Sequence, residues 1–291
     1  MSKLVIENEN IKATINPLGA ELVSLLKLDD NTEYMWDANP AFWGKTSPVL
    51  FPIVGGLKND TYFYEGNEYS LPRHGFARTM QFEVESQSES SAVFLLKNSL
   101  ETEKVYPFEF ELRLIYSLNA NKLDLKYHIT NPDSKALLFS IGGHPAFKCP
   151  IENELNYEDY FLEFNEKEDL ERWPLNSQGL VLDIPIEISK NTNKLMLTKE
   201  LFYEDALVFK YLKSDYVTLK SQNSSKQLKF EFKNFPYLGI WAAKDADFVC
   251  IEPWCGIADS ADTNQNFETK EGIISLASKS IFERSFSIEI S

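Results

Sequence analysis

Apolar and polar residues alternate along much of this chain with a period of two. In residues 108–118 (FEFELRLIYSL) the even positions are apolar and the odd positions are mostly polar. Residues 122–130 (KLDLKYHIT) repeat the pattern on odd positions, and the intervening NAN has the composition of a turn. Such alternation is typical of half-buried strands, so these two segments predict an antiparallel β-hairpin.

Other segments share this alternation and have turn-forming residues within or between them. They cover residues 3–15, 61–71, 92–98, 217–233 and 279–290. Helical periodicity is poor throughout, and no strand–helix–strand rhythm indicates a parallel nucleotide-binding sheet. We therefore predict an all-β fold with few short helices, built as one large antiparallel β-sandwich domain over residues 1–291. The Asn-, Glu- and Lys-rich region 150–200 predicts longer loops and insertions.

Composition narrows the classes of function. The formal net charge of the 291 residues is −15, and so negative a surface repels phosphate backbones and anionic lipids. We therefore expect neither nucleic acid nor a membrane as a partner. Aromatic residues make up 13%, which favours strands and flat sugar-binding surfaces. Three cysteines without a CxxC pair, no signal peptide and no apolar run of about 18 residues predict a cytoplasmic protein.

The three histidines differ in their surroundings. His128 shares the polar face of its predicted strand, which predicts a solvated side chain. His74 lies in the loop LPRHGFAR, where it is either a functional residue on a rigid scaffold or a stacked turn residue. His144 follows two glycines, which permit positive φ or close approach, and precedes Pro145, which restricts it to extended geometry. It is either aimed into a site or bonded to a carbonyl in the core.

Glu252 is the best candidate partner for these histidines. It lies in the apolar run FVCIEPWCG, where a carboxylate is costly unless it is paired or functional. Burial would raise its pKa toward the range useful for proton transfer, whereas an outward orientation or an arginine partner would make it structural. Trp254 beside it could stack on a sugar. No GxSxG, Walker, GxGxxG or HExxH motif is present, and the scattered histidines argue against a dedicated zinc site.

Three segments together resemble the aldose 1-epimerase (galactose mutarotase) family, in particular a LacX-like bacterial branch. They read LFPIVGGLKNDTYFYEGNEYSLPRHGFAR, SIGGHPAF and VCIEPWCGIADS, in that order along the chain. The resemblance implies a large antiparallel β-supersandwich and a cofactor-independent isomerase that interconverts sugar anomers. It further implies that Glu252 is the general base, His144 the general acid and His74 a second active-site histidine. Asp205 matches the position of a sugar-hydroxyl acceptor.

One position departs from the family pattern. Many relatives carry an arginine directly after the first glycine of VGGLK, where this chain has Gly56. Either Lys58 or Arg78 could reach the sugar instead, although lysine does not reproduce a bidentate arginine. The departure implies a substrate other than galactose or a weaker activity.

Two alternative functions remain open from the sequence. A hexose-6-phosphate 1-epimerase needs a basic pocket, which Arg73, Arg78 and Lys58 could supply near His74. A non-catalytic sugar-binding or regulatory protein could share the fold, because fold does not fix function. The sequence also leaves open which sugar binds and whether the chain forms a homodimer.

Overall fold

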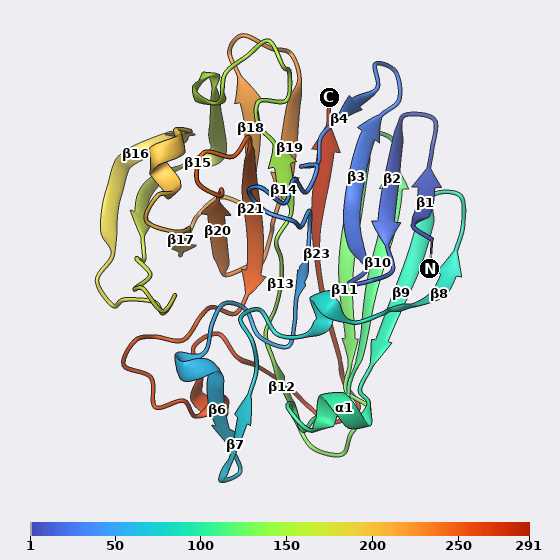
Figure 1. Cartoon of the computed structure of the whole chain (residues 1–291), viewed down its shortest axis with the longest axis vertical. Coiled ribbons are helices and arrows are strands. Elements are labelled where there is room, and N and C mark those ends of the chain that lie inside the picture. The colour runs from blue at the N-terminus through green and yellow to red at the C-terminus, as the bar shows by residue number, and fades with distance from the viewer. Residues whose placement is uncertain (1) are drawn as a thin grey trace.

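A nine-stranded antiparallel sheet dominates residues 2–291, which a computed structural model describes (Figure 1). Its strand order is β16-β15-β18-β19-β23-β11-β10-β9-β8. These strands are β8 (Glu83–Gln87), β9 (Ser91–Lys97), β10 (Glu111–Asn119), β11 (Lys122–Thr130), β15 (Tyr160–Arg172), β16 (Ile186–Met196), β18 (Tyr216–Ser221), β19 (Gln227–Glu231) and β23 (Ile281–Ile290). The alternating positions of β10 and β11 are buried on one face, which confirms the predicted hairpin.

A six-stranded sheet of shorter strands contributes Trp241, Glu252 and Trp254 to the site described below. Its order is β17-β20-β21-β13-β5, with β14 paired to β21 beside β13. These strands are β5 (Val49–Leu50), β13 (Ile141–Gly143), β14 (Ala146–Lys148), β17 (Leu207–Lys210), β20 (Tyr237–Trp241) and β21 (Phe248–Cys255). Every residue of β21 is buried, so this strand lies covered on both of its faces.

The two sheets pack closely against each other. A Cβ atom on Gly143 of β13 would lie 2.8 Å from the Tyr127 hydroxyl and 3.1 Å from Phe286 Cε1, side chains of β11 and β23. The rings of Phe147 in β14 and Phe230 in β19 lie 5.8 Å apart. Aromatic side chains thus fill the space between the sheets, where their burial stabilises the sandwich.

The remaining elements complete the sandwich and are mostly short. A four-stranded sheet holds β1 (Leu4–Glu7), β2 (Ile11–Asn16), β3 (Glu21–Lys27) and β4 (Thr32–Glu33), and two small sheets pair β6 (Thr61–Tyr64) with β7 (Asn67–Ser70) and β12 (Leu137–Phe139) with β22 (Ile274–Leu276). The helices are α1 (Leu100–Glu103) and the 3-10 turns η1 (Lys58–Asp60), η2 (Ala77–Thr79), η3 (Tyr157–Asp159), η4 (Lys199–Phe202) and η5 (Phe267–Thr269). Among residues 2–291, none of these helices has the length and apolar character that a membrane span requires.

The prediction for region 150–200 is wrong in one respect. Instead of loops throughout, it contains the two long strands β15 and β16, which pair with each other through several register shifts. Strand β16 forms the edge of the nine-stranded sheet, and most of its residues are exposed or half-exposed. An edge strand with so little buried surface carries polar residues, and its composition therefore resembles that of a loop.

Candidate active site

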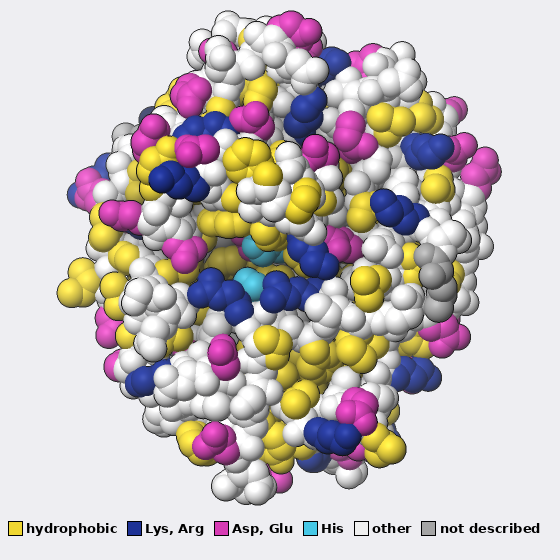
Figure 2. Space-filling view, viewed as in Figure 1, with side chains coloured by type: hydrophobic (Ala, Val, Ile, Leu, Met, Phe, Trp, Pro, Cys, Tyr) yellow, Lys and Arg dark blue, Asp and Glu magenta, His cyan; other side chains and the backbone are white. Residues whose placement is uncertain are grey.

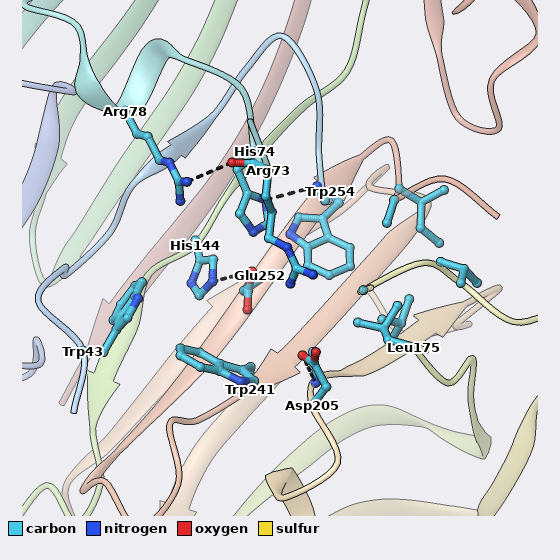
Figure 3. Close-up of a pocket in the computed structure, with 17 residues that line it drawn as sticks. Trp43, Arg73, His74, Arg78, His144, Leu175, Asp205, Trp241, Glu252 and Trp254 are labelled. Carbon is cyan, nitrogen blue, oxygen red and sulfur yellow. Dashed lines mark hydrogen bonds and ion pairs between the residues drawn. The ribbon is translucent and has the colours of Figure 1, made fainter. Parts of the chain in front are cut away.

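A cavity of about 410 Å³ opens above the six-stranded sheet, a volume within the usual range for small-molecule sites. Figure 2 shows it as a hollow in which histidine side chains lie between Lys or Arg side chains and hydrophobic ones. The lining residues that carry chemistry or aromatic surface are Trp43, Arg73, His74, Arg78, His144, Asp205, Trp241, Glu252 and Trp254. They come from loops and strand ends that are far apart in the sequence (Figure 3).

The indole of Trp254 is fitted against two glycines. In the sheet, Trp254 of β21 is paired with Gly142 of β13, and Glu252 with Gly239 of β20. A Cβ atom on Gly142 would lie 2.7 Å from Trp254 Cδ1, and one on Gly239 would lie 2.4 Å from Trp254 Cζ2. Gly142 therefore makes room for the indole, and its φ is not positive. Gly142, two residues before His144, therefore serves close packing rather than a special backbone angle.

Glu252 and His144 meet at the floor of the cavity. The Oε2 atom of Glu252 lies 3.3 Å from Nε2 of His144, and the two residues are 1% and 8% exposed. Neither Glu252 Oε2 nor His144 Nδ1 has a hydrogen-bond partner among residues 2–291. No arginine forms an ion pair with Glu252 in the described part of the chain. The alternatives of an outward-pointing glutamate and an arginine-paired one therefore fail.

Burial drives the pKa values of this pair apart. It raises the pKa of Glu252 well above the ordinary value, and the negative charge of Asp205 adds to the rise. Burial, together with the positive charge of Arg78, lowers the pKa of His144 to about 3. The two shifts therefore favour a proton on Glu252 beside a neutral imidazole.

Aromatic side chains hold His144 from two sides. The ring of Trp43 stacks on its imidazole with 4.8 Å between ring centroids and an interplanar angle of 27°. Trp241 meets the same imidazole edge-on at 5.6 Å. Because both rings also line the cavity, they orient His144 and offer apolar surface to a bound ring.

His74 is held in one tautomer by the backbone. Its φ is 67°, and its Nδ1 accepts a hydrogen bond of 3.1 Å from the Gly55 N–H. An accepting Nδ1 places the proton of the neutral ring on Nε2. Burial lowers the pKa of His74 well below its ordinary value, and the neighbouring His144 and the positive charges of Arg78 and Arg73 act in the same direction. His74 is therefore a neutral ring whose Nε2–H can donate.

Asp205 approaches the cavity from the loop that follows η4. Its φ of 94° is strained for a residue with a side chain, and its Oδ1 accepts a 2.7 Å hydrogen bond from the Ala206 N–H. Asp205 and Glu252 line the same cavity. The arrangement suits an acceptor for a sugar hydroxyl.

The basic residues fall into two groups. Arg73 and Arg78 line the cavity, and Arg78 Nη2 donates to the Arg73 carbonyl oxygen at 2.8 Å (Figure 3). Lys58 does not line it, because its ammonium donates to the Ala261 carbonyl at 3.1 Å. Of the two proposed replacements for the missing arginine, only Arg78 is therefore at the cavity.

His128 lies apart from this site. Its Nδ1 is 2.9 Å from Glu283 Oε1 across the β11–β23 pair, so it belongs to the outer face of the nine-stranded sheet. Sequence reasoning passed over two aromatic lining residues, Trp43 and Trp241, although it had named Arg73 as part of a basic pocket. Trp43 comes from a loop and Trp241 from a strand end, and neither is part of a motif. The only available signal was the aromatic content of the chain.

One cluster has the donor types of a metal site. The ligand atoms of His144, Cys250 and Glu252 lie within 4.8 Å of one another and are buried. Imidazole, thiolate and carboxylate could hold a divalent ion such as Zn²⁺. However, burial raises the pKa of the Cys250 thiol, which disfavours the thiolate that a metal requires. The sequence did not predict the cluster, because β14 and β21 pair only in the fold.

The sequence matches the family model for aldose 1-epimerase over residues 2–272. The chain belongs to the aldose 1-epimerase family. The resemblance stated from three motifs is thereby confirmed, and so are the β-supersandwich fold and a mutarotase-type function.

Individual relatives of this family are similar over nearly their whole length. The chain is 34% identical to protein LacX from Lactococcus lactis subsp. lactis, with 98% of each chain covered. A galactose mutarotase related enzyme from Lactobacillus acidophilus has a TM-score of 0.95 at 37% identity, covering 100% of this chain and 97% of that one. A galactose mutarotase-like protein from Lactobacillus casei has a TM-score of 0.94 at 31% identity, with full coverage of both chains.

Proposed function

We propose that the protein is an aldose 1-epimerase that interconverts the α and β anomers of a hexose without a cofactor. The observation that carries the proposal is the buried contact between Glu252 and His144, in which Glu252 Oε2 and His144 Nδ1 have no hydrogen-bond partner among residues 2–291. Mutarotation removes a proton from one oxygen and delivers one to another without a redox step. A positioned acid and base supply such transfers, each contributing about 10²–10⁴-fold.

The cycle begins with the single proton of the pair. Its transfer from Glu252 to His144 produces a carboxylate base and an imidazolium acid. Glu252 then takes the proton of the anomeric hydroxyl while His144 gives its proton to the ring oxygen. The bond between the anomeric carbon and the ring oxygen breaks, and a carbonyl forms.

Ring opening leaves Glu252 protonated and His144 neutral, which is the state that burial favours. Rotation about the bond next to the anomeric carbon presents the other face of the carbonyl. The reverse transfers close the ring and restore both groups. His74 can donate its Nε2–H to a sugar oxygen, Asp205 can accept from a hydroxyl, and Trp254 can pack against the apolar face of the ring.

A polarimeter tests this proposal directly. Freshly dissolved α-D-glucose and α-D-galactose are expected to lose optical rotation faster with the protein than with buffer. The absence of acceleration on any common aldose or its 6-phosphate contradicts an epimerase. Sugar binding without turnover would then favour a non-catalytic binding protein.

One observation favours hexose-6-phosphate 1-epimerase as a second candidate. Arg73 and Arg78 line the cavity, and neither forms an ion pair with a carboxylate of residues 2–291. Unpaired guanidinium groups suit a phosphate, and comparing kcat/KM on glucose and glucose 6-phosphate decides between the two substrates. The cytoplasmic location and the single domain stay predictions, and a homodimer stays a possibility.

A further inference from the structure

The side chain of Arg73 runs past two glycines on its way to the cavity. A Cβ atom on Gly56 would lie 3.9 Å from Arg73 Nε, so this guanidinium lies beside Gly56. A Cβ atom on Gly179 would lie only 1.6 Å from Arg73 Nη2 and 2.6 Å from its Cζ. The place of Arg73 therefore depends on the absence of a side chain at Gly179.

A rigid turn presents Gly179 to this arginine. The Asn176 side-chain oxygen accepts from the Gln178 N–H at 2.9 Å and from the Leu180 N–H at 3.0 Å. The Gly179 N–H donates to the Asn176 carbonyl at 2.8 Å. With φ at +73°, Gly179 adopts a conformation that other residues take at a cost. The turn is thus fixed independently of Arg73.

The guanidinium of Arg73 keeps most of its donors free. One of them, Nη2, makes a long 3.4 Å contact to the Gln178 carbonyl. Its other donors have no partner among residues 2–291, and Arg73 is exposed at the mouth of the cavity. Its backbone is held by the hydrogen bond from Arg78. A fixed backbone with free donors is suited to binding oxygen atoms of a ligand.

We propose that Arg73 is a specificity-determining residue that binds substrate oxygen atoms at the mouth of the cavity beside Gly56, and that Gly179 admits it. The proposal rests on the function proposed above for turnover, but sugar binding alone can test it. Both a pair of hydroxyls and a phosphate offer the oxygen acceptors that a guanidinium recognises. Comparing a sugar with its phosphate ester shows which of these two acceptors Arg73 contacts.

The primary test measures sugar affinity through quenching of tryptophan fluorescence, since Trp43, Trp241 and Trp254 line the cavity. Glucose and glucose 6-phosphate are each titrated into the wild type and Arg73→Ala. Loss of hydrogen bonds from a charged donor is expected to raise Kd about 10- to 100-fold. A larger rise with the phosphate identifies phosphate as the acceptor, and an equal rise identifies hydroxyls. An unchanged Kd for both ligands overturns the proposal.

Gly179→Ala tests the role of the glycine. It is expected to raise Kd by a factor similar to that of Arg73→Ala. In the Arg73→Ala background it is expected to add nothing, because the clashing group is already gone. An equal further rise in that background means that the turn itself is distorted, and it overturns the role assigned to Gly179.

A matched control separates steric displacement from backbone strain. Gly66 in the β6–β7 turn has φ of +78°, and a Cβ atom there would meet nothing within 4 Å. Gly66→Ala therefore carries similar strain without a clash, and its Kd is expected to equal that of the wild type. If catalysis is absent but wild-type binding is weakened by Arg73→Ala, the epimerase proposal fails while this inference stands.

Discussion

Two buried glutamates in this protein have opposite surroundings. Glu168 in β15 is 3% exposed, and its Oε1 accepts hydrogen bonds from the Ser214 N–H at 2.8 Å, the Ser214 hydroxyl at 2.7 Å and the Lys213 N–H at 3.0 Å. Glu252 in β21 is 1% exposed, and its Oε2 faces only His144. The first carboxylate fixes a turn, whereas the second is left without such partners.

The difference shows that burial of a carboxyl group has different consequences with and without hydrogen-bond donors nearby. Removing a carboxylate from water is costly unless hydrogen bonds replace those of the solvent. At Glu168 the turn provides them. At Glu252 burial raises the pKa instead, which makes proton exchange with His144 accessible. A buried carboxyl group whose oxygens accept hydrogen bonds indicates a structural role, and one without such partners in a cavity indicates catalysis.

Glu252→Gln is expected to have the largest effect. It keeps the shape of the side chain but removes the base, so kcat should fall about 10²–10⁴-fold. The free energy of unfolding should not decrease, because no hydrogen bond to the Oε2 atom is lost. Polarimetry measures kcat, and urea unfolding measures the free energy of unfolding. A variant that loses stability but keeps the wild-type kcat per folded molecule would contradict this prediction, because Glu252 would then have a structural role like that of Glu168.

Glu168→Gln is the matched change in the other region. Its neutral amide accepts hydrogen bonds more weakly than a carboxylate, so the free energy of unfolding should fall by about 1–2 kcal/mol. The kcat of the folded variant should equal that of the wild type. Urea unfolding and polarimetry on the same preparation measure both. A large loss of kcat without loss of stability would contradict a purely structural role.

Trp43→Leu tests whether the ring stacked on His144 orients this proposed acid. It removes the ring stacked on His144, and aromatic pairs contribute about 0.5–1.5 kcal/mol. We expect kcat to fall about 2- to 10-fold by polarimetry. Trp43→Phe keeps an aromatic ring and should recover most of the rate. Equal losses in both variants would mean that the stack does not orient His144.

The smallest expected effect is that of acidic pH on the rate. Because the pKa of His144 lies at about 3 in the folded protein, kcat/KM corrected for uncatalysed mutarotation should change less than about twofold between pH 7 and 5. A fall in kcat/KM as the pH drops through the ordinary pKa of histidine would contradict this prediction.

The same shift has a consequence for stability. The unfolded chain binds the His144 proton at higher pH than the folded chain does, so this residue destabilises the fold as pH falls from 6.5 toward 3. In His144→Gln this part of the pH dependence should disappear from urea unfolding curves.

More of the fold than of the site could be predicted from the sequence. Alternation over residues 108–130 specified a hairpin, because one strand face is buried and the other is not. The same logic failed for β16, whose edge position exposes most of its residues. His144 and Glu252 could be nominated from local sequence, but their contact depends on the pairing of β13 and β14 with β21.

Other parts of the site lacked any local signal. Lys58 and Arg73 were equally plausible neighbours of His74, and only the fold directs Lys58 to the Ala261 carbonyl and Arg73 past Gly179. Trp43 contacts His144 from a loop that precedes it by about a hundred residues. Contacts between distant loops are set by tertiary packing, which periodicity does not encode.

The protonation of Glu252 at neutral pH is the most direct test of the account. Infrared difference spectra at pH 7 can compare the wild type with Glu252→Gln and with Glu168→Gln. The account predicts the carbonyl band of a protonated carboxyl group that is lost in Glu252→Gln and kept in Glu168→Gln. A wild-type spectrum without that band, or one in which the band survives Glu252→Gln, would contradict it.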